Sequence, residues 1–103
     1  MNEVLYTLCR HNVNIMNGWY PFASTAISKS LDISLYKTRK ELKKLKEQGL
    51  VESCIYTISD DEWNCIFRGY RITDKAKDTE EYKKAFKEER KICKECFGID
   101  INE

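Results

Sequence analysis

The hydrophobic pattern of the chain changes at Gly49, from the spacing of a helix to the spacing of a strand. Before this glycine, Leu42 and Leu45 repeat at helical spacing, which predicts a helix over residues 35–48. Glycine is favoured just after a helix because it readily adopts positive φ. After it, residues 50–58 are rich in β-branched and aromatic residues, as is typical of a strand. The fold must therefore contain a helix that turns tightly into a strand.

The rest of the second half predicts a hairpin and a final helix. A strand-like run at residues 65–72 follows the polar residues 59–62, so the two strands are expected to pair through a tight turn. Thr73 is a suitable N-cap for a helix that would continue to Gly98. Asp78 and Glu81 offer a capping box one turn later.

The first half predicts two short helices before the helix of residues 35–48. Asn2 can cap an amphipathic helix over residues 2–12, and Ser24 or Thr25 begins a second one. Ser34 is the expected N-cap of the third helix. Between the first two helices, the aromatic residues 19–22 are expected to be extended, because the residue before a proline avoids helical geometry.

This order of elements predicts an α+β, mainly α fold in a single domain over residues 1–103. Its parts are a three-helix core with a β-hairpin wing (residues 2–73) and a long C-terminal helix (residues 74–98). The loose apolar stripe of that last helix also predicts a dimerisation arm, so a homodimer is expected.

Charge is concentrated on the third helix. The whole chain has a net charge of only +1, but residues 37–46 carry six bases against one acid, a net charge of +5. A basic stripe on an otherwise acidic body orients a protein on a polyanion better than a diffuse charge does. Double-stranded DNA is therefore the expected partner.

Three segments resemble bacterial winged helix-turn-helix regulators. Residues 24–34 (STAISKSLDIS) resemble the first helix and turn, and residues 37–51 (KTRKELKKLKEQGLV) resemble the recognition helix and its Gly-Leu-Val exit into the wing. Residues 69–76 (GYRITDKA) are similar to the returning wing strand and the helix cap after it. The resemblance covers residues 2 to about 90 and does not separate MarR-like, PadR-like and ArsR-like regulators or phage-encoded relatives. It implies a DNA-binding transcriptional regulator.

The DNA-contacting residues follow from the outward face of the third helix. Arg39 is the best candidate for a base contact, because its guanidinium can engage O6 and N7 of guanine. Leu35 and Tyr36 are expected near a thymine methyl group or a sugar. Acidic residues 60–62 at the wing tip depart from the basic tip common in such families and argue against insertion of the wing. The remaining predicted contacts, mostly to phosphates, are Ser24, Thr25, Ser34, Lys37, Lys40, Lys43, Lys44, Arg68 and Arg71.

Two other interpretations of these features stay open. A lysine-rich helix face is often only solvated surface, and winged helices also serve as protein-binding modules. The alternative function is an interaction module in a phage or plasmid replication or packaging assembly.

The cysteines, the histidine and the aromatic cluster have structural and functional interpretations. Cys9, His11, Cys93 and Cys96 would form a zinc site if the terminal helices brought them together, but small core cysteines and a surface histidine are favoured. Cys54 and Cys65 could face each other across the hairpin, and packed thiols are favoured there over a redox switch. The aromatic residues 19–22 are expected in the core rather than around a small-molecule effector.

Several classes of function are disfavoured. One histidine, the absence of a glycine-rich phosphate loop and the absence of nucleophile motifs argue against an enzyme, and no cofactor is expected. The N-terminus lacks the pattern of a signal peptide, and no stretch approaches the roughly 20 apolar residues of a membrane span. The odd number of cysteines argues against a disulfide framework. We therefore expect a cytoplasmic protein with reduced thiols.

Overall fold

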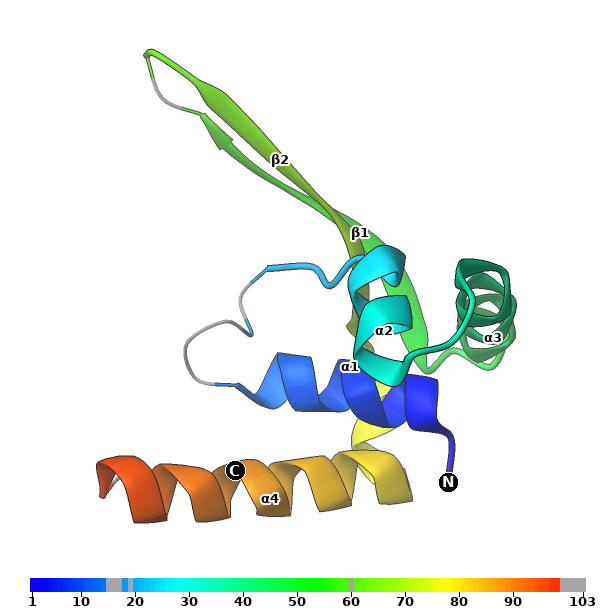
Figure 1. Ribbon diagram of the computed structural model, residues 1–103, viewed down its shortest axis with the longest axis vertical. Helices are drawn as coiled ribbons and strands as arrows, with labels where there is room; N and C mark the ends of the chain where they lie inside the picture. The colour runs from blue at the N-terminus through cyan, green and yellow to red at the C-terminus, as the bar shows by residue number, and fades with distance from the viewer. Residues whose placement is uncertain (15–17, 19, 60, 99–103) are drawn as a thin grey trace.

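The computed structural model describes residues 1–14, 18, 20–59 and 61–98 of the 103-residue chain (Figure 1). Within these residues the fold is α+β and mostly helical, as the sequence predicts. The elements are α1 (Glu3–Val13), α2 (Ser24–Leu31), α3 (Leu35–Glu47), β1 (Val51–Ser59), β2 (Asn64–Ile72), the 3-10 helix η1 (Asp74–Asp78) and α4 (Glu80–Phe97).

The predicted caps of the first and third helices are confirmed. The side chain of Asn2 accepts a hydrogen bond from the Leu5 backbone nitrogen at 3.0 Å, and the Ser34 hydroxyl accepts one from the Lys37 nitrogen at 3.1 Å. Gly49 has φ +76°, which lets α3 end and the chain turn into β1. Local signals of this kind act within four residues, so the sequence alone can reveal them.

The region between the hairpin and the last helix differs from the prediction. The prediction of a single helix capped by Thr73 is wrong, because η1 and α4 are separate elements. The Thr73 hydroxyl donates instead to the Gly49 carbonyl at 2.5 Å. The predicted capping box of Asp78 and Glu81 is also wrong. The residue that caps α4 is Thr79, whose hydroxyl accepts a hydrogen bond from the Tyr82 backbone nitrogen at 3.2 Å.

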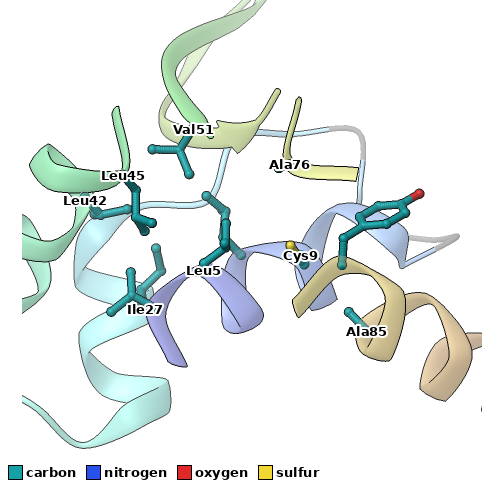
Figure 2. Close-up of a cluster of buried hydrophobic side chains, with 11 residues drawn as sticks. Leu5, Cys9, Ile27, Leu42, Leu45, Val51, Ala76 and Ala85 are labelled. Atoms are coloured by element: carbon teal, nitrogen blue, oxygen red, sulfur yellow. The ribbon is translucent and has the colours of Figure 1, made fainter. Parts of the chain in front are cut away.

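The core is built around α1, which packs on α2, α3, β2 and α4. α4 lies along α1 on the side opposite α2 and the hairpin (Figure 1). Leu42 and Leu45 face Ile27 in this core, as predicted, and Thr38 is fully buried beside them. Figure 2 shows how the helices contribute to one cluster, whose labelled members are Leu5, Cys9, Ile27, Leu42, Leu45, Val51, Ala76 and Ala85.

The hairpin is an antiparallel pair that projects from the body of the molecule (Figure 1). Its register pairs Val51 with Ile72 at the base and Ser59 with Asn64 near the tip. A short extended segment adds one bridge at the base. Phe22 exchanges two backbone hydrogen bonds with Tyr70, of 3.0 and 2.9 Å. Trp19, at the other end of the predicted extended segment, lies outside the described residues.

The topology of three helices, a hairpin and a further helix resembles a winged helix. Among the described residues, no helix combines the length and apolar character that crossing a bilayer requires.

Candidate nucleic-acid interface

α3 separates its apolar and cationic residues onto two faces. Thr38, Leu42 and Leu45 are buried, and the Thr38 hydroxyl donates to the Ser34 carbonyl at 3.0 Å. The predicted cations of α3 all lie exposed on the remaining surface. They are Lys37, Arg39, Lys40, Lys43 and Lys44, followed by Lys46 in the last turn.

The two uncharged residues of α3 predicted to contact DNA, Leu35 and Tyr36, both lie in its first turn but differ in exposure. The Tyr36 side chain is 78 % exposed, whereas Leu35 is only half-buried. Glu41 is the one acid on α3 before its last residue, and it pairs with Lys44 at 3.7 Å. The N-terminal half of the helix therefore offers an aromatic ring and an arginine beside several lysines.

The hairpin and α2 bring three further predicted residues together. Ser24, Thr25 and Arg68 line one shallow groove between the start of α2 and the exposed face of the hairpin. Arg71 lies on the other face, because side chains three positions apart on a strand point in opposite directions. There it pairs with Glu52 at 3.5 Å. The structure therefore groups Arg68, but not Arg71, with the start of α2.

The outer part of the hairpin is acidic at its tip and apolar along its sides. Asp61 and Glu62 are exposed, and Asp60 lies outside the described residues. Large apolar side chains follow on both faces of the hairpin. The exposed fractions are 67 % for Ile55, 53 % for Trp63 and Ile66, and 45 % for Tyr56. This surface differs from a basic, DNA-inserting wing, and the sequence analysis did not identify its apolar character.

His11 is buried, so the prediction of a surface histidine is wrong. Its ring stacks on Phe22, with centroids 4.1 Å apart, and its Nε2 donates to the Tyr20 carbonyl at 2.9 Å. Tyr20 in turn contacts Phe67 of β2 at 5.7 Å between ring centroids. The aromatic cluster therefore joins α1 to the hairpin. Phe22 packs against the core as predicted, whereas Tyr20 is only partly buried and lies outside the core cluster.

The cavity beside Tyr20 is too small for most effectors. Its volume is about 60 Å³, whereas sites for drug-sized ligands are usually about 300 Å³ or larger. The described residues around Tyr20 therefore give no support to an effector site there.

The cysteines are distributed differently from the prediction. Cys9 and Cys93 are buried as expected, but Cys96 is exposed rather than in the core. Burial raises the pKa of the Cys9 thiol to about 12, with the Glu81 carboxylate adding to the effect. α1 and α4 do pack together, yet the described residues contain no group of three or more His, Cys, Asp or Glu side chains that could hold a metal ion.

Cys54 and Cys65 do not face each other. The register places Cys54 opposite Gly69 and Cys65 opposite Ile58, which rules out the pairing that the sequence left open. The two cysteines share a face but lie four positions apart along the strands. Sequence spacing alone could not reveal this, because register depends on where the turn closes.

Comparison with protein-family models, with curated proteins and with solved structures finds no match to this chain. Only its own sequence and geometry therefore bear on its function.

Proposed function

We propose that this protein binds double-stranded DNA sequence-specifically through α3 and acts as a transcriptional regulator. The observation that carries the proposal is the separation of faces on α3. Six cations are exposed on the helix whose other face is anchored in the core by Thr38, Leu42 and Leu45. A rigidly held helix of this kind fits the major groove, which is about 12 Å wide.

The proposed roles differ between groups of interface residues. Arg39 reads a guanine edge, while Tyr36 and Leu35 contact a thymine methyl group or a sugar. Lys37, Lys40, Lys43 and Lys44 neutralise phosphates and supply most of the affinity. Ser24, Thr25 and Arg68 share one groove next to the hairpin, which suits a further phosphate. Arg71 is engaged by Glu52, so we assign it a smaller contribution.

The finer assignment to MarR-like, PadR-like or ArsR-like regulators rests on the sequence resemblance. A homodimer through residues 74–98 stays a prediction. Tyr82, Ala85 and Cys93, which contributed to the predicted dimerisation stripe, pack inside the monomer. Ile92, 41 % exposed, remains on the surface of α4 for such a contact. The proposed role is binding rather than catalysis, with no cofactor.

Fluorescence anisotropy of a labelled random-sequence duplex at low and moderate salt tests the proposal. The test variant is Arg39→Ala/Lys40→Ala. The control, Lys29→Ala/Lys77→Ala, removes the same charge from exposed positions on α2 and η1. Each phosphate contact contributes about −0.9 to the slope of log K against log salt. We therefore expect the test variant to bind more weakly and with a slope shallower by about 1 to 2.

The control variant should bind as the wild type does. Equal binding by the wild type and the test variant, or no binding by the wild type at low salt, would refute DNA recognition by α3. Random-sequence duplex suits this test because phosphate contacts bind DNA of any sequence.

A protein-binding module is the second candidate, and the exposed apolar side chains of the hairpin favour it. Ile55, Trp63 and Ile66 are each more than half exposed, although apolar side chains of this size usually avoid water. This candidate would be supported if the wild type failed to bind duplex DNA but bound a protein partner, and if the Ile55→Ser/Ile66→Ser variant no longer bound that partner.

A further inference from the structure

α4 carries a second group of cations that the sequence analysis left out. All six bases of this helix are exposed. Four of them, Lys83, Lys87, Arg90 and Lys94, follow each other at spacings of four, three and four residues. Residues at this spacing lie on one side of a helix, so these four form a single row about 16 Å long. We call Lys83, Lys87, Arg90 and Lys94 the α4 row.

The acids of α4 are largely turned toward α1. Glu81 accepts from the Asn2 backbone nitrogen at 3.3 Å, and Glu89 pairs with Arg10 at 3.5 Å. Glu88 accepts from the Tyr6 hydroxyl and pairs with Arg10 at 3.9 Å. The helix has a net charge of only +1, but three of its five acids engage α1. The other two, Glu80 and Glu95, are exposed together with the six bases, so the exposed side chains still carry a net charge of +4. The outward face is therefore strongly positive.

The charge of the α4 row is not balanced inside the molecule. Among the described residues, no acid lies within 4.0 Å of the cationic group of any of the four residues. Solvated protein surfaces usually intersperse both signs of charge, which makes a row of one sign informative. A row of this kind suits a partner with regularly spaced negative charges.

The α4 row and the cationic face of α3 point away from the core in different directions. α4 packs on α1 and η1, whereas α3 packs on α1, α2 and β1. Figure 1 places α4 on the far side of α1 from α2 and the hairpin. α3 and α4 therefore occupy separate parts of the molecule, α3 beside α1 and α2 and α4 below α1 in the view of Figure 1.

We infer that the α4 row binds the phosphate backbone of a second DNA duplex, so that one protein molecule bridges two duplexes. This inference rests on the proposed function of α3. B-form DNA carries one negative charge per about 1.7 Å of its axis, so a row about 16 Å long faces several phosphates. Lysines and an arginine without neighbouring donors to base edges give affinity but no sequence preference.

A membrane surface fits the α4 row less well than DNA. Helices that lie on membranes insert a large apolar face beside their cations. The apolar side chains Tyr82, Ala85 and Cys93 of α4 are instead buried in the monomer. Among its described side chains, Ile92 is the one large apolar group classed as exposed. Little apolar surface is therefore left for lipid.

A two-duplex capture assay tests the inference. One duplex of about 16 bp is attached to beads, and a second fluorescent duplex of the same length is captured only when the protein binds both. Such duplexes are far shorter than the persistence length of about 150 bp, so neither can wrap around the protein. The test variant is Lys87→Ala/Arg90→Ala/Lys94→Ala, and its melting temperature is compared with that of the wild type.

The wild type should capture the second duplex at low salt and release it as salt rises. The test variant should capture about tenfold less while its anisotropy affinity for a single duplex changes by less than about threefold, because α3 is intact. A charge-matched control, Lys29→Ala/Lys75→Ala/Lys77→Ala, should capture as the wild type does.

Two outcomes overturn the inference but leave the proposed role of α3 unaffected. One is a wild type that binds a single duplex but captures no second one. The other is full capture by the test variant, which would assign bridging to a dimer with two α3 helices. In the first case, binding of the wild type to phosphatidylserine-containing vesicles that the test variant does not bind would assign the α4 row to a membrane instead. Failure of single-duplex binding by the wild type would refute the proposed function itself.

Discussion

The imidazole ring of His11 lies almost parallel to the ring of Phe22, with an interplanar angle of 10° and centroids 4.1 Å apart. This stack joins α1 to the segment that precedes α2. Burial lowers the pKa of His11, although its hydrogen bond to the Tyr20 carbonyl acts in the opposite direction. The neutral imidazole is therefore the form that the fold stabilises.

We predict that mild acid destabilises the protein through His11. The pKa of His11 is lower in the folded state than in the unfolded state, so the unfolded chain takes up the proton first. The free energy of unfolding should therefore fall as the pH drops below about 6.5, the usual histidine pKa. Thermal melts between about pH 7 and pH 5.5 measure this effect, above the usual range of carboxylates.

His11 is the only histidine in the chain, which makes the control direct. His11→Gln keeps an N–H donor for the Tyr20 carbonyl but does not titrate. Its melting temperature should be lower than that of the wild type at pH 7 and nearly constant across the window. Equal pH dependence in the two proteins would exclude His11 as the cause.

Gly69→Ala should strongly destabilise the base of the hairpin. A Cβ atom at this position would lie 2.4 Å from the Phe22 carbonyl oxygen and 2.9 Å from the Ala23 nitrogen, and both are backbone atoms. The bridge between Phe22 and Tyr70 would have to move, and overpacking of this kind costs about 1–3 kcal/mol. Urea denaturation measures the loss.

Ser53→Ala, an exposed change on the neighbouring strand, is the control for Gly69→Ala and should cost less than about 0.5 kcal/mol. A Gly69→Ala protein as stable as this control would mean that the segment of Phe22 is not held against β2.

Ser34 offers a way to separate stability from DNA binding. Ser34→Ala removes the acceptor for the Lys37 nitrogen and should cost about 1 kcal/mol. Ser34→Asp keeps an acceptor and places a negative charge at a helix N-terminus, so stability should be retained. The same charge lies beside the proposed phosphate contacts, so duplex affinity should fall in anisotropy titrations. Unchanged affinity of Ser34→Asp would contradict a phosphate near the start of α3.

Arg10 and Glu89 should be strongly coupled in stability. Glu89 is only 5 % exposed and pairs with Arg10 at 3.5 Å. Arg10→Met leaves this carboxylate buried without its cation, which should cost about 3 kcal/mol. The double variant Arg10→Met/Glu89→Met removes both charges and should recover most of the loss. A double variant that is less stable than Arg10→Met would show that the pair is not the dominant interaction there.

The features predicted correctly from the sequence depend on neighbours in the chain. Asn2 and Ser34 cap helices whose first turns they adjoin, and Gly49 ends α3 by its own φ angle. The inward residues of α3 follow from helical periodicity alone. The start of α4 was mislocated because four residues that can cap a helix, Thr73, Asp74, Asp78 and Thr79, occur within seven positions, and only the structure shows that Thr79 caps α4.

The features that were missed depend on distant segments. His11 follows Val4 and Leu8 at helical spacing, so periodicity offered a signal for its burial, but its ring partners Phe22 and Tyr20 come from another segment. The α4 row was hidden because a charge count over the helix sets six exposed bases against five acids, three of which engage α1. Helical spacing of the bases alone would have shown the row, but only the fold shows that the acids are engaged elsewhere.

The contact between α1 and α4 also bears on how the chain reaches its native state. The central helix α1 and its partner α4 are far apart in the sequence, and Asn2 bonds to Glu81 across 79 positions. Contacts between such distant positions raise the contact order. Folding should therefore be slower than in helical bundles whose helices pack mainly on the next helix in the sequence, because a long loop must close before the contact forms. During translation, the side of α1 that packs on α4 stays uncovered until α4 emerges from the ribosome, so folding of these elements is expected to be cooperative.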